Sequence, residues 1–279
     1  MGMQINTNLA ANNTYRNLNA TQNDLSKSLE KLSSGLRINR AADDAAGLSI
    51  SEGLRSQVGG LTVAARNAQD GISVVQTAEG GLTEVHSILQ RVRDLAVQAG
   101  NDSNNADARS AIKTESDALG DELNRIAAST NFNGINLLDG SADLTFQVGA
   151  GSTAASDQIG VDLTAANIAT IGAAVKALDF TTAAGAVGAT GTIATIDGHI
   201  KDVSTSRSAL GAVQNRFEHS IASTNVAKEN LTAAGSRIRD VDMAEEMVKY
   251  TRSNVLSQAG QAMLAQANQS TQGVLSLLR

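Results

Sequence analysis

Apolar residues spaced in alternating steps of four and three mark both ends of this chain, and they constrain its fold more than any other feature. One series runs from Ala11 to Leu36 and another from Leu256 to Leu277. This spacing places one narrow apolar seam along an α-helix, the pattern of a coiled-coil partner. A helix with a single seam gains most of its stability from packing. The two ends therefore need each other, or other copies of the chain, and the sequence predicts a molecule that assembles.

A longer helix is predicted over about residues 43–100, followed by a shorter one over 106–129. One seam of the long helix runs from Leu54 to Leu89, and a second, from Val74 to Leu95, opens halfway along it. Because each seam is buried against one neighbour, two seams predict helices on two sides. At about 1.5 Å per residue such a helix is on the order of 85 Å long, which is a rod.

The middle of the chain has the least regular pattern. Ile135–Leu138 and Leu144–Val148 flank Asp139-Gly140, which predicts a β-hairpin. Residues 149–191 are rich in Ala, Gly and Thr, and we expect short strands and a helix near 165–178. After them an apolar heptad resumes as far as Leu231, and a further helix is expected after Gly235.

These elements predict a mostly α protein: an elongated rod of long antiparallel helices and a terminal coiled coil, with a small β-hairpin region. The predicted domains are a terminal coiled coil of residues 1–42 and 236–279, a helical rod with the hairpin in residues 43–140 and 191–235, and a short variable surface insert in residues 141–190.

Composition excludes several classes of function. The chain has no cysteine, which excludes disulfides, iron–sulfur clusters, thiolate zinc sites and cysteine nucleophiles. The formal charge is −6 and the sequence contains no basic cluster, so it gives no sign of a nucleic-acid-binding surface. It also contains no stretch of about 18 apolar residues of the kind that would predict a membrane-spanning helix. The three histidines lie far apart and no phosphate-binding loop occurs. We therefore expect no enzyme, no cofactor and no metal.

Two weaker signals have competing interpretations. The pair Asp43-Asp44 suits either a helix start, where the macrodipole favours negative charge, or a metal site, and we favour the helix start. His86 lies on an apolar seam, where a packed or partly exposed histidine is favoured over a ligand. The N-terminus lacks a basic region followed by an apolar one, so no secretory signal peptide is expected.

Long collinear blocks of the sequence resemble those of bacterial flagellins. The blocks are Gln22–Gln57, Leu89–Gln98, Asn131–Gly134, Ser236–Met247 and Leu275–Arg279. The similarity covers about 140 residues at the N-terminus and about 80 at the C-terminus. Only about 50 residues lie between these regions, so the chain resembles a short form that lacks large outer domains.

The resemblance implies an extracellular structural subunit that self-assembles into the helical flagellar filament for swimming motility. It also implies export in the unfolded state through the flagellar type III apparatus, an export chaperone on about residues 240–279, and contacts with filament cap and hook-associated proteins. We expect the seams to carry assembly through Leu18, Leu25, Leu29, Leu32, Leu256, Met263, Val274 and Leu277. A flagellin-like hook–filament junction protein is the alternative, and an enzyme within residues 141–190 is a third hypothesis that no nucleophile–base or ligand set supports.

Flagellins of some bacterial groups are recognised by the innate immune receptor Toll-like receptor 5. The resemblance carries this role to Gln90, Arg91, Leu95, Gln98 and Glu115. Arg91 can donate a forked set of hydrogen bonds, which suits an interface anchor. The alternative is that Arg91 and Glu115 serve subunit packing or solvation, and for the physiological role we favour that alternative.

Overall fold

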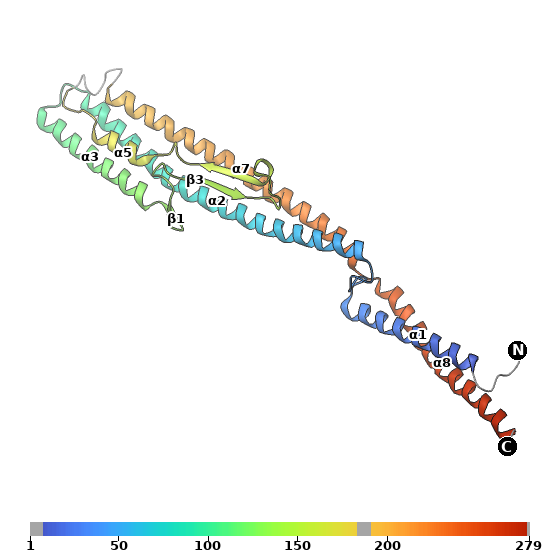
Figure 1. Cartoon of the computed structure of the whole chain (residues 1–279). Helices are drawn as coiled ribbons and strands as arrows, with labels where there is room; N and C mark the ends of the chain where they lie inside the picture. Colours follow the sequence, from blue (N-terminus) through green and yellow to red (C-terminus); the bar gives the residue numbers. More distant parts are fainter. Residues whose placement is uncertain (1–7, 183–190, 278–279) are drawn as a thin grey trace. The chain divides into compact units, whose positions relative to one another are not determined.

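A computed structural model describes residues 8–182 and 191–277, and within these ranges the side chains of Ala10 and residues 270–277 lie outside the description. The chain is mostly α-helical (Figure 1). Its helices are α1 (Leu9–Ser34), α2 (Ala45–Ala99), α3 (Ala106–Ser129), α4 (Ala154–Asp157), α5 (Ile168–Lys176), α7 (Thr192–Arg239) and α8 (Met243–Leu277). Two compact units are present: Met1–Ser56 with Asn230–Arg279, and Gln57–Glu229.

In the first unit α1 and α8 lie side by side and antiparallel (Figure 1). The side-chain amide of Asn8, before α1, donates to the carbonyl of Ala267 near the end of α8, at 3.0 Å. At the other end Gly35 closes α1 with a φ of 72°, in the left-handed region that glycine adopts without strain. Leu36 then forms an antiparallel bridge with Asp240. The predicted pairing of the two chain ends is confirmed.

The boundary between the last two helices differs from the prediction. We expected a break at Gly235, but α7 continues through this residue to Arg239, and α8 begins at Met243. The break falls where Arg37 N–H donates to the Arg239 carbonyl and Val241 N–H donates to the Gly35 carbonyl. Because these backbone bonds replace helical ones, a tertiary contact ends the helix, and the glycine does not.

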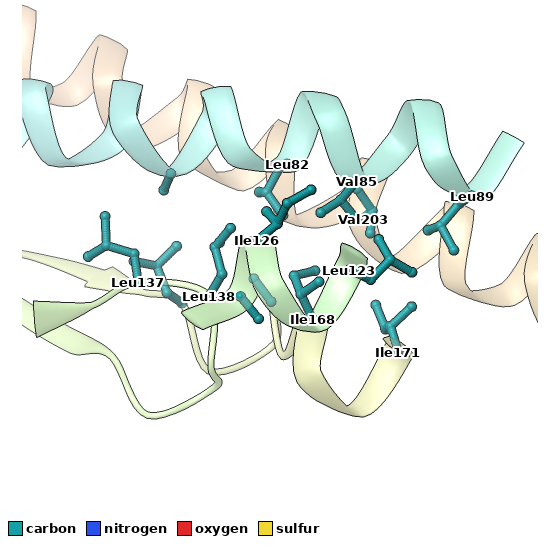
Figure 2. Close-up of a cluster of buried hydrophobic side chains, with 14 of the residues drawn as sticks. Leu82, Val85, Leu89, Leu123, Ile126, Leu137, Leu138, Ile168, Ile171 and Val203 are labelled. Atoms are coloured by element: carbon teal, nitrogen blue, oxygen red, sulfur yellow. The ribbon is translucent and has the colours of Figure 1, made fainter. Parts of the chain in front are cut away.

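The second unit holds the hydrophobic core, with α2 between two neighbours. An ion pair joins α2 to each neighbouring helix: Arg91 pairs with Glu115 of α3, and Arg93 pairs with Asp197 of α7. Between them the apolar side chains of α2 are buried, and Leu82, Val85 and Leu89 point toward residues of α3, α5 and α7 (Figure 2). The seam from Val74 to Leu95 is buried or half-buried throughout, whereas the seam that begins at Leu54 is only half-buried as far as Ala65 and has fully buried residues from Ala68 onward.

The β-structure pairs differently from the prediction. Asn131–Phe132 (β1) pairs with Ile135–Asn136 (β2) around Asn133-Gly134, and Asp143–Gln147 (β3) pairs with Gln158–Asp162 (β4), both antiparallel. The predicted hairpin across Asp139-Gly140 is wrong. Asn133 and Gly134 both have positive φ, which is the requirement of a two-residue hairpin turn, and this places the first hairpin before residue 137.

The segment predicted as a surface insert also contributes to the core. Val161 of β4, Ile168 and Ile171 of α5, and Phe180 beyond it are buried in the same cluster as α2. Helix α5 lies within the predicted range of 165–178 and packs on α3, with Lys176 paired to Asp121 at 2.7 Å.

Within the described ranges, no helix is long and apolar enough to cross a membrane, and no cluster of three potential metal-ligating side chains is found.

Candidate assembly surface

The less exposed side of α8 mixes small and polar residues with two larger ones, Tyr250 and Leu264, which are half-buried. Glu246 and Ser257 of α8 are buried, as is Ser28 of α1. A Cβ placed on Gly260 would lie 3.3 Å from Cδ1 of Leu18, so this glycine gives α1 a close approach. Among the described side chains of α1 and α8 no hydrophobic one is fully buried, so the α1–α8 contact removes only part of their apolar surface from water.

Other large apolar side chains of α8 point away from α1. Six of them are between 48% and 64% exposed, and we call this set the α8 apolar face: Met243, Met247, Val248, Val255, Leu256 and Met263. Met247, Val248, Val255 and Leu256, with Thr251 and Arg252, line a groove of about 480 Å³ along the helix. A contiguous exposed apolar surface of this kind marks an interaction site.

The seam residues predicted for assembly differ in how far their side chains are exposed. Leu18, Leu25 and Leu32 of α1 are half-buried, whereas Leu29 is 54% exposed. Leu256 and Met263 belong to the α8 apolar face, and the side chains of Val274 and Leu277 lie outside the described residues.

The contact strip on α8 also differs from the predicted seam. The strip runs through Glu246, Ser257 and Gly260, so of these three only Gly260 lies on the seam predicted from the apolar spacing. Sequence reasoning selected the most apolar strip, but the strip that is covered in the free subunit is a mixed one, in which Gly260 permits a close approach at Leu18. Gly260, whose small size permits a close helix approach, was the signal that could have located part of it.

Charged side chains lie beside the α8 apolar face, and Arg252 lies in its groove. Lys249 pairs with Glu245 at 2.8 Å, one helical turn before it, and this hydrogen bond raises the pKa of the Lys249 ammonium. The buried carboxylate of Glu246 lies 3.7 Å from the same ammonium. The face therefore combines exposed apolar side chains with a few polar and charged neighbours.

The residues predicted to contact an immune receptor fall into two groups. Gln90, Arg91, Gln98 and Glu115 are exposed, and Arg91 donates through Nε and Nη2 to Oε1 of Glu115 at 2.9 and 2.6 Å. Leu95 departs from the prediction: it is 1% exposed and packs in the core. Its side chain cannot reach a partner at the surface, so its contribution is to hold α2 in place.

The structure also shows the surroundings of Asp43-Asp44 and His86, the two weaker signals of the sequence. Oδ1 of Asp44 accepts from the N–H of Gly47 at the start of α2, and Oδ2 of Asp43 accepts from the N–H groups of Asn39 and Arg40. These bonds confirm the helix-start interpretation of the acidic pair. His86 is half-buried, with Nε2 2.9 Å from Nε2 of Gln90.

Comparison with known proteins agrees with this arrangement. The family description "Bacterial flagellin N-terminal helical region" matches residues 5–143, and "Bacterial flagellin C-terminal helical region" matches residues 193–278. The chain belongs to the bacterial flagellin family. The two matched regions contain α1 and α8, the helices that carry the exposed seam residues.

Individual relatives match along almost the whole chain. A flagellin of Halalkalibacterium halodurans is 54% identical over 278 residues, covering 99% of this chain and 100% of the relative. A flagellin of Bacillus subtilis is 48% identical, and a flagellar filament 33 kDa core protein of Treponema phagedenis is 46% identical, each with 99% of this chain and 100% of the relative covered. The crystal structure of Bacillus cereus flagellin matches with a TM-score of 0.48 and 32% identity, covering 57% of this chain and 88% of that one.

Membership of this family makes the chain a structural subunit of the extracellular flagellar filament, a homopolymer. The matches over the full length of short relatives agree with a form that lacks large outer domains. The family is a structural one, which is consistent with the expectation that the chain is not an enzyme.

Proposed function

We propose that the subunit polymerises by burying the α8 apolar face, together with exposed side chains of α1, against the terminal helices of neighbouring copies. The observation that carries this proposal is the outward orientation of six large apolar side chains on α8. Full burial of one such side chain contributes about 1.5–3 kcal/mol, so repeated contacts along a helix suffice for a stable polymer. On α1, Tyr15 and Leu29 are exposed and supply complementary apolar surface.

A second copy is the occupant that this surface suits best. A polymer of one chain needs contact surfaces that repeat in every subunit, and paired terminal helices provide them. The predicted terminal coiled coil of residues 1–42 and 236–279 would then be held by contacts between subunits more than by contacts within one subunit.

The same exposed face supports the proposed partners before and during assembly. An export chaperone that covers residues 240–279 would shield the α8 apolar face from premature association. Passage through the flagellar type III apparatus in an unfolded state is compatible with terminal helices of low stability, and no described hydrophobic side chain of α1 or α8 is fully buried. Filament cap and hook-associated proteins would meet the same face at the two ends of the polymer.

Seeded polymerisation with electron microscopy tests the proposal. We expect the purified chain to extend filament fragments, and the variant Leu256→Asp to fail, because a carboxylate would have to be buried without a partner. Gln261→Asp is the matched control, since it adds the same charge at another exposed position of α8 and should leave extension intact. Equal extension by all three proteins would contradict the proposed role of the face. Short assemblies that never elongate would favour the hook–filament junction alternative.

We also propose that the free subunit is a ligand of Toll-like receptor 5 through Gln90, Arg91, Gln98 and Glu115. In support, these four residues are exposed on α2 and α3, and the ion pair fixes the Arg91 guanidinium at the surface. Arg91→Ala should weaken receptor binding by about tenfold or more, as expected for an interface anchor. Arg93→Ala, which breaks the pair with Asp197 on the other flank of α2, is the control. Equal loss in both variants would argue against a specific role for Arg91.

A further inference from the structure

The methionines whose side chains are described lie at the surface of α8 and not in the hydrophobic core. Of five methionines in the chain, Met243, Met247 and Met263 lie in α8 and all three are about half exposed or more. The other two, Met1 and Met3, lie outside the described residues. Among the described residues, the buried core cluster contains no methionine. Methionine usually fills gaps in cores, so this distribution concentrates the accessible thioethers on one helix.

These three side chains belong to the α8 apolar face. Met243 and Met247 are one turn apart on the same side of the helix, and Met247 lines the groove with Val255 and Leu256. Met263 follows Leu256 by seven residues, so these two share a second side. Every described methionine therefore lies at the surface that the proposed function buries between subunits.

We infer that Met243, Met247 and Met263 form a redox modification site that takes hydroperoxide-class oxidants and blocks assembly when oxidised; the inference rests on the proposed function of the α8 apolar face. In the reaction a sulfur lone pair bonds to one peroxide oxygen and the O–O bond breaks. The departing oxygen leaves as water when the oxidant is hydrogen peroxide, after taking up the proton of the transferred oxygen. Sulfur loses two electrons, the peroxide gains two, and the product is methionine sulfoxide.

Oxidation would act on assembly through desolvation. A sulfoxide oxygen is a strong hydrogen-bond acceptor, and at the α8 apolar face it is solvated in the free subunit. Association would strip that water from an oxygen whose neighbours in the groove are mostly hydrocarbon, from Val248, Val255 and Leu256, with Thr251 and Arg252 as the two polar residues of the lining. The free subunit stays folded, because the oxidised side chains lie outside the core cluster. Methionine sulfoxide reductases return the thioether, so the block is reversible.

The test uses the full chain as free subunits treated with hydrogen peroxide. Peptide mass spectrometry should find one added oxygen at each of Met243, Met247 and Met263, and seeded polymerisation should fall about tenfold or more, because burying even one unpaired polar oxygen weakens a contact by that order. Circular dichroism should show unchanged helix content. Treatment with methionine sulfoxide reductases should restore polymerisation. Oxidised subunits that polymerise as well as untreated ones, or a block that the reductases do not reverse, would overturn the inference.

A triple methionine variant tests whether the loss of polymerisation after peroxide treatment arises at Met243, Met247 and Met263. In the triple variant Met243→Leu, Met247→Leu and Met263→Leu, Met1 and Met3 remain oxidisable, so polymerisation after peroxide should equal that of the same variant before peroxide. A peroxide block that persists in this variant would place the effect at the N-terminus and refute the site. Failure of the proposed function would be seen in a different measurement: untreated wild-type subunits that do not extend seeds would refute burial of the face. The mass spectra would still show whether the three thioethers are oxidised.

Discussion

Close packing at a single glycine sets the distance between α2 and α7. A Cβ on Gly71 would lie 2.6 Å from Cζ of Phe217, whose ring is fully buried and packs edge-on to Phe146. Gly71→Ala would gain about 1 kcal/mol of helix propensity, but overpacking the ring costs about 1–3 kcal/mol. We expect a net loss of stability of up to about 2 kcal/mol, measured by denaturant unfolding.

Gly80 provides the matched control on the same helix. A Cβ there meets nothing within 4 Å, and the residue is exposed. Gly80→Ala should therefore stabilise the chain by up to about 1 kcal/mol. Stabilisation of similar size by both substitutions would mean that Phe217 moves aside freely, against the packing described here.

An exposed carboxylate should give the loop before α2 a pH dependence. The N–H groups of Arg40 and then Asn39 donate to Asp43, and these hydrogen bonds lower the pKa of its carboxyl below the ordinary value of 3.8. Because the folded-state pKa is depressed, the contribution is present above the unfolded value and is lost as pH falls through the folded one.

Thermal unfolding of wild type and Asp43→Asn measures this contribution. The variant should be less stable near neutral pH, and the difference should narrow from about pH 5 to about pH 2. A difference that is constant over this range would show that the charge of Asp43 is not responsible.

At the scale of elements, two leucines that differ in burial should differ in their effect on the stability of the free subunit. Leu89 of α2 is fully buried, whereas Leu29 of α1 is 54% exposed. Leu89→Ala should lower the free energy of unfolding of the free subunit by about 2–5 kcal/mol. Leu29→Ala should change it by less than about 0.5 kcal/mol, as is usual at the surface. Chemical denaturation measures both, and a comparable loss in the two variants would contradict the burial assigned to α1.

The long helices could be predicted because their signals are local and repeated. The two seams of α2 recur over many turns, and Asn105 caps α3 through the N–H of Ala108 at the predicted start. The strand pairing could not be predicted in the same way, because Asp139-Gly140 and Asn133-Gly134 are both acceptable turns by composition. Which of them reverses the chain depends on contacts distant in sequence.

Helix α8 shows the limit of apolar spacing as a guide to a candidate site. The spacing identified Leu256 and Met263 as assembly residues but could not tell which side of the helix α1 covers. That choice depends on Gly260, which permits close approach at Leu18. Leu95 differs from the other predicted receptor residues in being buried, which a family resemblance alone does not indicate.

At the scale of the whole molecule, the two units differ in how they are stabilised. The unit of residues 57–229 contains nearly all the buried hydrophobic side chains, including those of the central part of α2. In the other unit, Ile38 is the one buried hydrophobic residue among those whose side chains are described. The unit that contains α1 and α8 is therefore expected to open locally at a low free energy, whereas the unit of residues 57–229 should unfold cooperatively.

Hydrogen exchange of backbone amides, compared between free subunits and filaments, tests the central claim most directly. In free subunits α1 and α8 should exchange much faster than residues 74–95 of α2, because no described hydrophobic side chain of the terminal helices is fully buried. In filaments the exchange of α1 and α8 should slow strongly, while that of α2 changes little. Terminal helices that are already as protected in the free subunit as the central part of α2 would contradict the account.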